Sequence, residues 1–318
     1  MDKPKIVAIV GPTASGKTAL SIELARKFNG EIVSADSRQI YRGMDIGTAK
    51  PNRDRDNGTG IIDTLSPVPL YLSHNVPHFL IDIRNPNEDY TVADYKRDAE
   101  AAIGGIVQRG KLPILVGGTG LYVRAVLENL DIPKIAADPA LRAQIESEIK
   151  EKGLASVFEK LVERDPEAAY VVDPRNPRRV VRALEVATLT GEPFTAQRKK
   201  REPIYDARKI GVNPKPEILR ERIGRRIDEM LQGGLVAEVQ RLIGQYGPNC
   251  AAFDAIGYRE IIEYLDGKIS LEKSAADMKL NTWHYAKRQL TWFRKDKEIV
   301  WVEDNAEAQS LVSGFLKL

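Results

Sequence analysis

The segment Gly11-Pro12-Thr13-Ala14-Ser15-Gly16-Lys17-Thr18 limits the folds open to this 318-residue chain more than any other segment does. It fits the pattern G-x-x-x-x-G-K-[ST], whose glycines let backbone N–H groups close around phosphate oxygens. The apolar, β-branched run Lys5–Val10 precedes it, and a helical pattern over Thr18–Phe28 follows it, as this mechanism requires. Lys17 supplies a positive charge, and the Thr18 hydroxyl can bind Mg²⁺. The segment therefore predicts a binding site for a diphosphate or a triphosphate.

Short apolar runs alternate with helical patterns along most of the chain. This alternation predicts an α/β fold, a P-loop NTPase-like parallel sheet covered by helices. The expected strands after the first are Glu31–Ala35, Phe79–Ile83, Leu112–Val116, Lys209–Val212 and Ile299–Val302. The expected helices are Thr18–Phe28, Val92–Gln108, Leu121–Leu127, 216–232, 235–245, 257–266 and 270–294.

The alternation stops in the middle of the chain, where only helical patterns occur. Asp138-Pro139 is typical of a helix N-cap followed by proline at the first helical position, and Gly153 ends that helix. We therefore expect an all-helical insertion domain at 134–205, within an α/β domain made of 1–133 and 206–318.

The charges are unevenly distributed, although the net charge is only 48 − 45 = +3. Between Arg175 and Lys209, ten Lys and Arg residues face four Asp and Glu residues. A solvated helical surface and a site for a polyanion both fit this excess.

No segment indicates a membrane protein or a disulfide-stabilised one. The longest apolar runs are far shorter than the roughly 20 residues of a membrane span, and no signal peptide is visible. Cys250 is the single cysteine, so an internal disulfide is excluded. We expect a cytoplasmic protein without a membrane partner.

Two predicted turns carry polar groups to the edge of the sheet where such folds bind ligands. Asp36 follows the strand expected beside the P-loop strand, where a carboxylate can hold Mg²⁺, act as a general base or cap the following turn. Ser37 and Gln39 carry groups that can read the edge of a base. The turn Gly117-Gly118-Thr119-Gly120 brings a hydroxyl to the same edge, or serves only as a tight strand-to-helix turn.

Two further features can bind anions. The loop Gly43–Pro51 contains two glycines and Lys50, which is suited to closing over an anion. Arg222 and Arg226 are four residues apart on one polar face of the helix 216–232, so both can hold a leaving diphosphate, as ordinary surface arginines also could.

These motifs occur in the order and spacing of one family. The chain resembles bacterial tRNA dimethylallyltransferases, also called tRNA isopentenyltransferases, from residue 5 to about 302. The matching segments are Gly11–Thr18, Ala35–Tyr41, Met44–Pro51, Gly117–Tyr122, Asn176–Glu185, Ala255–Tyr258 and Lys287–Arg294.

The resemblance implies a specific reaction. It implies that the P-loop holds the diphosphate of dimethylallyl diphosphate and that N6 of the adenosine immediately 3′ of the anticodon is the acceptor. Asp36 would be the general base that receives the N6 proton. Thr18, through Mg²⁺, and Lys17 would stabilise the diphosphate, while Arg222 would neutralise its departing charge. From its place on the same helix face, we expect Arg226 to add a further contact to the diphosphate.

The resemblance also implies an RNA-binding surface, with the insertion gripping the anticodon stem-loop. We expect no obligate protein partner and a monomer. The residues expected to contact tRNA are Asp36, Ser37, Arg38, Gln39, Thr119, Arg142, Arg178, Arg179, Arg182, Asp254, Gly257, Tyr258 and Arg259.

One segment departs from the family pattern, and three other functions are alternatives to the one that the resemblance implies. Asn52–Asn75 is longer than the usual connection and is expected to extend a surface loop. An adenylate isopentenyltransferase shares the donor, but a free nucleotide needs no basic insertion. A P-loop kinase of small molecules would use ATP, which the family match disfavours. A non-catalytic RNA-binding module would have no use for the P-loop and Asp36.

Overall fold

The computed structural model describes residues 3–54, 70–132, 135, 138–196 and 201–318. The chain divides into two compact units, one made of Met1–Leu127 with Pro203–Leu318 and the other of Glu128–Glu202. Among the helices of these described residues, none has both the length and the apolar composition needed to cross a bilayer.

One sheet organises the larger unit. Within the described residues its seven strands lie in the order β3-β4-β2-β5-β1-β6-β7, and all neighbours are parallel except β3 and β4. The predicted α/β architecture with a parallel sheet is therefore confirmed. The strands are β1 (Lys5–Val10), β2 (Gly30–Ser34), β3 (Tyr71–Ser73), β4 (Val76–Phe79), β5 (Leu112–Gly117), β6 (Asp206–Val212) and β7 (Val300–Val302).

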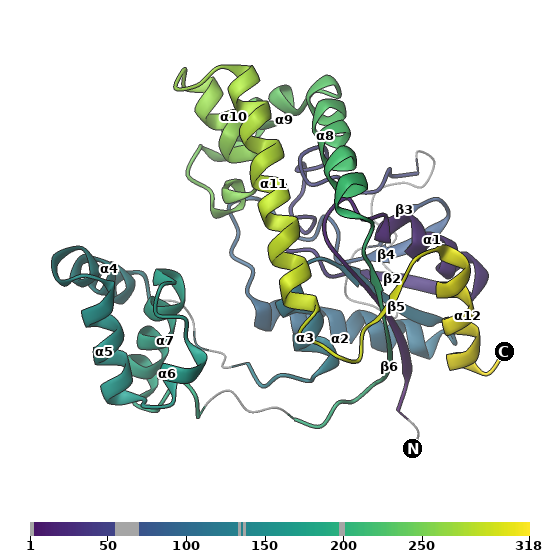
Figure 1. The fold of residues 1–318 in the computed structure, drawn as a ribbon, viewed down its shortest axis with the longest axis horizontal. Helices are drawn as coiled ribbons and strands as arrows, with labels where there is room; N and C mark the ends of the chain where they lie inside the picture. The colour runs from purple at the N-terminus through teal and green to yellow at the C-terminus, as the bar shows by residue number, and fades with distance from the viewer. Residues whose placement is uncertain (1–2, 55–69, 133–134, 136–137, 197–200) are drawn as a thin grey trace. The chain divides into compact units, whose positions relative to one another are not determined.

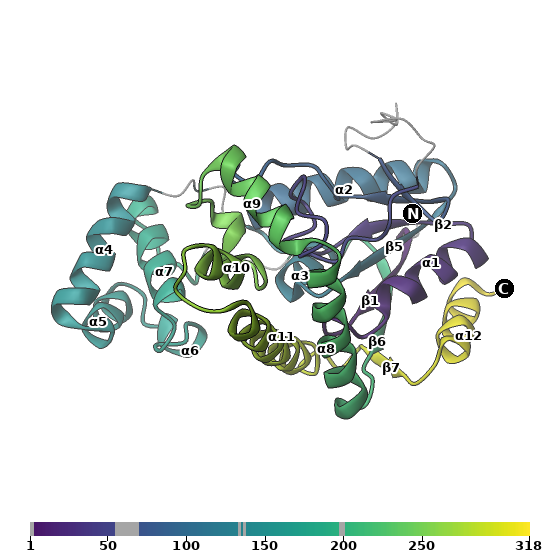
Figure 2. The same cartoon turned by 90° about the horizontal axis from the view of Figure 1, so that it is seen from above.

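Helices cover both faces of this sheet (Figures 1 and 2). Because successive side chains of a strand point to opposite faces, Val7 and Ile9 of β1 pack with α1 and α12, whereas Ile6 and Ala8 belong to the core on the other face. The helices of this unit are α1 (Lys17–Lys27), α2 (Val92–Gln108), α3 (Gly120–Leu127), α8 (Pro216–Gln232), α9 (Leu235–Tyr246), α10 (Tyr258–Leu265), α11 (Leu271–Phe293) and α12 (Asn305–Leu316), with a 3₁₀ turn at Ala251–Asp254.

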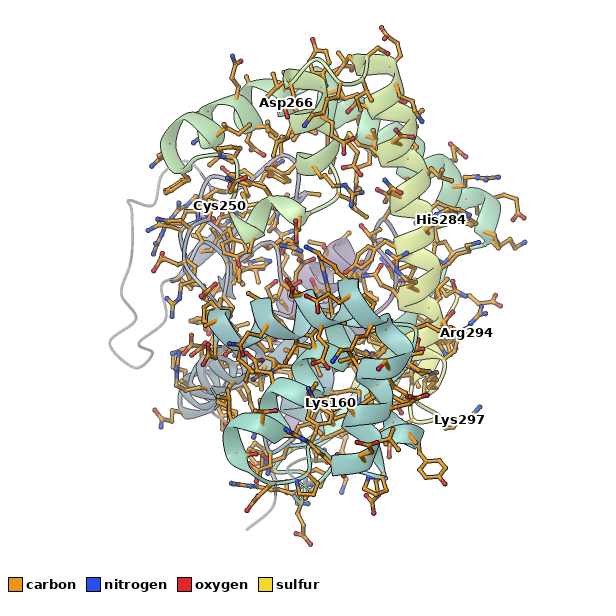
Figure 3. The ribbon with its side chains drawn as sticks, turned by 90° about the vertical axis from the view of Figure 1, so that its left-hand side faces the viewer. Lys160, Cys250, Asp266, His284, Arg294 and Lys297 are labelled. Carbon is orange, nitrogen blue, oxygen red and sulfur yellow. The ribbon has the colours of Figure 1, made fainter. Side chains whose placement is uncertain are left out.

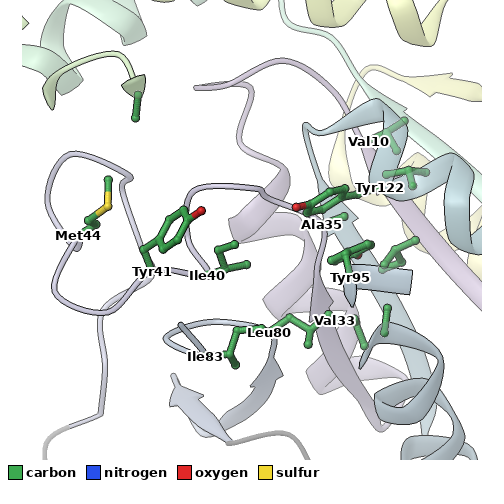
Figure 4. Close-up of a cluster of buried hydrophobic side chains, with 14 of the residues drawn as sticks. Val10, Val33, Ala35, Ile40, Tyr41, Met44, Leu80, Ile83, Tyr95 and Tyr122 are labelled. Atoms are coloured by element: carbon green, nitrogen blue, oxygen red, sulfur yellow. The ribbon is translucent and has the colours of Figure 1, made fainter. Parts of the chain in front are cut away.

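The larger core supports the segment that follows β2. Figure 4 shows apolar side chains of this segment, among them Ile40, Tyr41 and Met44, in the cluster that also contains Tyr95 and Tyr122. The rings of Tyr95 and Tyr122 stack, with centroids 3.8 Å apart and an interplanar angle of 12°. This packing gives the loop after β2 a rigid base.

The expected strand Phe79–Ile83 is wrong, because β4 occupies Val76–Phe79 and ends there. Leu80 and Asp82 have φ angles of 65° and 57°, which lie in the left-handed region and cannot continue a strand.

The expected surface loop Asn52–Asn75 is also partly wrong. Tyr71–Ser73 near its end forms β3, which pairs antiparallel with β4, and Tyr71 is buried. Residues 55–69 lie outside the described part. The helix α12 was not expected from the sequence.

The smaller unit consists of helices α4 (Pro139–Lys152), α5 (Leu154–Arg164), α6 (Ala168–Val171) and α7 (Pro177–Thr190) within its described residues. The side chain of Asp138 caps α4, and Gly153 with φ 86° ends it, as predicted. We expect the insertion at 134–205, but the compact unit spans Glu128–Glu202. The two ends of this unit are hydrogen-bonded to each other, since the Asn129 side chain donates to the carbonyl of Glu202 at 2.9 Å.

Candidate active site

The backbone conformation of the P-loop depends on two of its glycines. Gly11 has φ 152° and Gly16 has φ 98°, both in the region that side chains rarely adopt. A Cβ at Gly11 would lie 2.4 Å from the carbonyl oxygen of Val212, so no side chain fits there. The loop leaves β1 and enters α1, whose N-terminus adds the positive end of a helix dipole.

Three cationic side chains surround this loop. The Lys17 ammonium donates to the carbonyl of Pro12 at 2.9 Å, Nη1 of Arg222 donates to the carbonyl of Ser15 at 3.1 Å, and Nη1 of Arg226 lies 3.4 Å from Thr13 Oγ1. Both arginines come from α8, where they flank its buried stripe Leu219, Ile223 and Ile227. The structure thus brings together the P-loop and the two arginines that the sequence singled out.

Burial weakens the hold of two of these groups on their protons. It lowers the pKa of Lys17 to about 8, although the nearby Asp36 carboxylate acts in the opposite direction. Burial likewise lowers the pKa of Arg226, again against the influence of Glu229 and Asp36. A cluster of half-buried positive charges that outnumber the nearby Asp36 carboxylate favours a multiply charged anion.

Asp36 lies at the same edge, in the segment after β2. One carboxylate oxygen, Oδ1, accepts a hydrogen bond from the backbone N–H of Arg38 at 2.9 Å, so Asp36 does cap the following turn. Its charge nonetheless acts on Lys17 and Arg226. We expect the strand of Asp36 next to the P-loop strand, but β5 lies between β2 and β1. Since all three strands are parallel, their carboxyl ends still meet at one edge.

Thr119 connects this edge to α11. Its Oγ1 accepts from the backbone N–H of Ser37 at 3.1 Å, and its own N–H donates to the carbonyl of Ala35 at 3.1 Å. The Tyr285 hydroxyl of α11 hydrogen-bonds to the Thr119 side chain, and burial together with the Asp36 charge raises the Tyr285 pKa to about 12. Tyr285 is a site residue that sequence reasoning missed.

Gln289 is a second missed residue, and it joins the two turns. Its Oε1 accepts from the backbone N–H of Thr13 at 2.8 Å, and its Nε2 donates to the carbonyl of Gly118 at 2.9 Å. Gln289 is 6% exposed and lies on the buried face of α11 with Ala286 and Phe293. An amide within an apolar helical stripe is the sequence signal that could have found it.

The prediction that Lys50 closes over an anion is wrong. Its ammonium donates to the carbonyl of Tyr41 at 2.6 Å and to the carboxylates of Asp45 and Asp82, and its side chain is 2% exposed. Lys50 is therefore an internal ion-pair residue that fixes its own loop.

A buried carboxylate on α9 also holds that loop. Glu238 Oε2 accepts from the N–H groups of Asp45 and Ile46 at 2.9 and 2.8 Å, and Oε1 accepts from the Gly47 N–H at 3.1 Å and the Tyr258 hydroxyl at 2.6 Å. No sequence feature had pointed to Glu238.

Two expected tRNA contacts are wrong because they are buried. Tyr258 is fully buried with its hydroxyl on Glu238, and Gly257 is buried with its N–H on the Glu260 carboxylate. In this structure neither residue offers an exposed surface to RNA. Asp254 and Arg259 from the same segment are exposed.

The side chains of Arg38 and Gln39 also contact segments next to the sheet edge. Arg38 Nη1 donates to the carbonyls of Ala251 and Ala252, both at 3.2 Å. Gln39 accepts from Ser34 Oγ and lies 3.4 Å from the carbonyls of Thr48 and Ala49. Both side chains are half-buried, so each has surface left to offer to a ligand.

The outer side of α11 is basic and aromatic. A surface depression there is lined by His284, Lys287, Arg288, Thr291, Trp292 and Lys295. Figure 3 shows His284 and, at the end of the helix, Arg294 along this element.

The predicted arginines of the smaller unit differ in their surroundings. Arg178 and Arg179 are exposed in the first turn of α7. Arg142 and Arg182 instead bond to Glu185, a buried residue of the same unit.

Among the residues that the structure describes, no group of three or more His, Cys, Asp or Glu side chains could hold a metal ion.

Comparisons with known proteins agree over almost the whole chain. A family model described as IPP transferase matches residues 39–296, and one described as Isopentenyl transferase matches residues 4–62. A tRNA dimethylallyltransferase of Halalkalibacterium halodurans is 43% identical over 304 residues, which is 95% of this chain and 91% of that protein. A protein of the same name from Bacillus anthracis is 41% identical over 325 aligned positions and covers 100% and 98%.

Solved structures show the same similarity. A full-length tRNA isopentenylpyrophosphate transferase of Bacillus halodurans is 41% identical with a TM-score of 0.69, covering 99% of this chain and 97% of that one. A eukaryotic dimethylallyltransferase acting on tRNA is 26% identical with a TM-score of 0.76, covering 99% and 80%.

Proposed function

Because this chain belongs to the IPP transferase family, we infer that it is an enzyme that transfers a dimethylallyl group to tRNA. Dimethylallyl diphosphate is the donor that this class of enzyme uses. The observation that supports the donor site best is the convergence of Lys17, Arg222 and Arg226 on a P-loop beside Asp36. The adenylate transferase and the P-loop kinase are not favoured, since the relatives named above act on tRNA.

For the reaction we propose that N6 of the adenosine 3′ of the anticodon attacks the first carbon of the dimethylallyl group. The new C–N bond forms while the bond between that carbon and the diphosphate oxygen breaks, and its electron pair stays on the diphosphate. An aromatic amine is a weak nucleophile, so stabilising the leaving group supplies much of the rate.

The P-loop cations meet this requirement. Lys17, Arg222 and Arg226 and the N-terminus of α1 lie around the P-loop, so they would face the diphosphate as it gains charge on leaving. All three side chains are half-buried, and this partial burial strengthens their electrostatic effect, because water screens a buried charge poorly.

Asp36 is the proposed base. The N6 proton passes to its carboxylate, which leaves neutral dimethylallyl-adenosine. The hydrogen bond from the Arg38 N–H occupies Oδ1 and orients the carboxylate, so Oδ2 is the oxygen proposed to take the proton.

Mg²⁺ fits this site as a partner of the substrate. Thr18 offers a hydroxyl beside the phosphate cradle, and the remaining ligands would be diphosphate oxygens and water. When bound, Mg²⁺ supplies additional positive charge against the leaving diphosphate.

The acceptor must be taken out of the anticodon loop. Extruding an adenine costs a few kcal/mol, which contacts to the flanking RNA can offset. We assign these contacts to Arg38, Ser37, Gln39 and Thr119 at the sheet edge, with Asp254 and Arg259, and to Arg142, Arg178, Arg179 and Arg182 of the helical unit. We also propose that the enzyme works as a monomer in the cytoplasm, where tRNA is modified.

A competition between acceptors and donors tests this function. The protein with Mg²⁺ receives labelled dimethylallyl diphosphate and either an anticodon stem-loop or AMP, and ATP is offered in a parallel reaction. We expect label in the stem-loop alone and no phosphate transfer from ATP. Label in AMP instead, or phosphorylation of an acceptor by ATP, would contradict the proposal.

A further inference from the structure

Glu185 in the helical unit is a buried carboxylate, and two of its partners are arginines assigned above to tRNA binding. Glu185 of α7 is 0% exposed. Its Oε1 accepts from Arg142 Nε at 2.9 Å and from the backbone N–H of Asp138 at 2.8 Å. Its Oε2 accepts from Arg142 Nη2 at 3.1 Å and from Arg182 Nη1 at 2.6 Å. These four hydrogen bonds use the acceptor capacity of the carboxylate.

These hydrogen bonds orient the two arginines but leave both side chains partly exposed to solvent. Arg142 contacts Glu185 through two nitrogens, a bidentate arrangement that fixes the plane of the guanidinium. Arg182 is held twice, since its Nη2 also donates to the carbonyl of Ile135 at 3.0 Å. The side chains of Arg142 and Arg182 remain 40% and 35% exposed. Each therefore presents part of a fixed guanidinium to solvent.

The charge balance of this cluster remains positive. Two guanidinium groups share one carboxylate, and burial of Glu185, which opposes ionisation, is outweighed by the bonds from Arg142 and Arg182, so its pKa lies below the usual range. Arg178 and Arg179 lie one helical turn before Arg182 and add exposed positive charge. The cluster thus offers a polyanion two oriented donors rather than two mobile ones.

We propose that Glu185 is a positioning residue for tRNA, which sets Arg142 and Arg182 in the orientation that binds the anticodon stem-loop. This proposal rests on the tRNA-binding role assigned to those arginines. Holding a long side chain in its bound rotamer before binding removes an entropic cost that binding would otherwise include. A buried acidic residue would then increase the affinity of a basic surface for RNA.

The substitution Glu185→Gln tests this, because two explanations predict opposite signs. If only net charge matters, removing a negative charge from a basic unit strengthens RNA binding. If Glu185 positions the arginines, binding weakens, because the glutamine NH₂ group opposes a guanidinium or the Asp138 N–H and lets one arginine turn away. We expect the KM for the stem-loop to rise by about ten-fold with kcat unchanged, while the Kd for an oligo(U) of equal length stays the same or falls.

Two further variants keep the result interpretable. Glu163→Gln removes the same charge from an exposed position of α5 and should leave the KM of the stem-loop unchanged or slightly lower. Arg142→Lys keeps the charge but loses the bidentate fork, so it should raise the same KM. Far-UV circular dichroism checks that each variant is folded. If Glu185→Gln does not fold, Arg142→Lys alone decides.

The outcomes separate this inference from the function itself. Unchanged or tighter stem-loop binding in both Glu185→Gln and Arg142→Lys overturns the positioning role, even if the wild-type enzyme transfers dimethylallyl normally. Failure of the wild type to modify the stem-loop contradicts the proposed function. In that case the affinities of the wild type and the variants for the stem-loop, measured without donor, still decide the role of Glu185.

Discussion

Asp36 accepts a local hydrogen bond and is also the proposed base. A substitution can remove the second role and keep the first. Asp36→Asn keeps an oxygen for the Arg38 N–H but cannot accept the N6 proton, so we expect turnover to fall by roughly 10²–10⁴-fold. The Kd for tRNA should change little. Asp89→Asn, at an exposed position, is the control. Full turnover of Asp36→Asn would remove Asp36 from the role of base.

Lys17 should give the donor site a pH dependence. Its burial lowers its pKa to about 8, so the ammonium that is proposed to hold the diphosphate is lost as the pH rises through about 8. Since kcat/KM reports the ionisation of the free enzyme, kcat/KM for dimethylallyl diphosphate should be constant below this pH and fall above it. In Lys17→Arg the falling limb should disappear. A wild-type profile that stays flat well above pH 8 would contradict this role.

Arg226 and Arg225 are neighbours in sequence but differ in surroundings. Arg226 faces Thr13 of the P-loop, whereas Arg225 is 63% exposed and pairs with Glu229 on the surface of α8. We expect Arg226→Ala to reduce kcat/KM for the donor by about 10²-fold and Arg225→Ala to leave it within about two-fold. Steady-state kinetics of both variants measure this difference. Equal effects would contradict a diphosphate contact by Arg226.

The loop Gly43–Pro51 depends on a helix far away in sequence. Glu238 on α9 accepts four hydrogen bonds, three of them from this loop. Glu238→Gln replaces one acceptor oxygen by a donor, which faces other donors in a buried site. We expect the free energy of unfolding to fall by about 2–4 kcal/mol, measured by urea denaturation. Glu229→Gln on the surface of α8 is the control and should change it by less than about 0.5 kcal/mol.

The sequence predicts those elements whose signal is local. The P-loop with its flanking β1 and α1 follows from a short motif, and α2 and α8 have the predicted bounds because their apolar residues keep a helical period. The same period placed Arg222 and Arg226 on one face. The early end of β4 could not be predicted, because Leu80 and Asp82 adopt left-handed backbone without being glycine.

The residues that escaped prediction share a physical property. Gln289, Glu238 and Tyr285 are polar groups whose partners are distant in sequence, such as the N–H of Thr13 or the side chain of Thr119. Their contacts follow from tertiary packing; a local pattern, an amide in an apolar helical stripe, marks only Gln289. The order of β2, β5 and β1 is likewise a long-range property of the sheet.

The whole molecule combines the proposed donor site in one unit with exposed arginines in the other. The Arg178→Ala, Arg179→Ala double variant removes two exposed charges from α7. We expect weaker tRNA binding and a smaller slope of log Kd against log salt concentration, because fewer counterions are released. The KM for dimethylallyl diphosphate should stay the same. Unchanged tRNA binding would place the RNA surface elsewhere.

The proposed function depends on which nucleotide receives the dimethylallyl group. The most direct measurement is mass spectrometry of the nucleosides and fragments of an anticodon stem-loop after incubation with the protein, Mg²⁺ and dimethylallyl diphosphate. We expect one dimethylallyl group, on N6 of the adenosine 3′ of the anticodon, and none in a stem-loop with guanosine at that position. A group at another nucleotide, or no transfer to RNA, would contradict the proposed reaction.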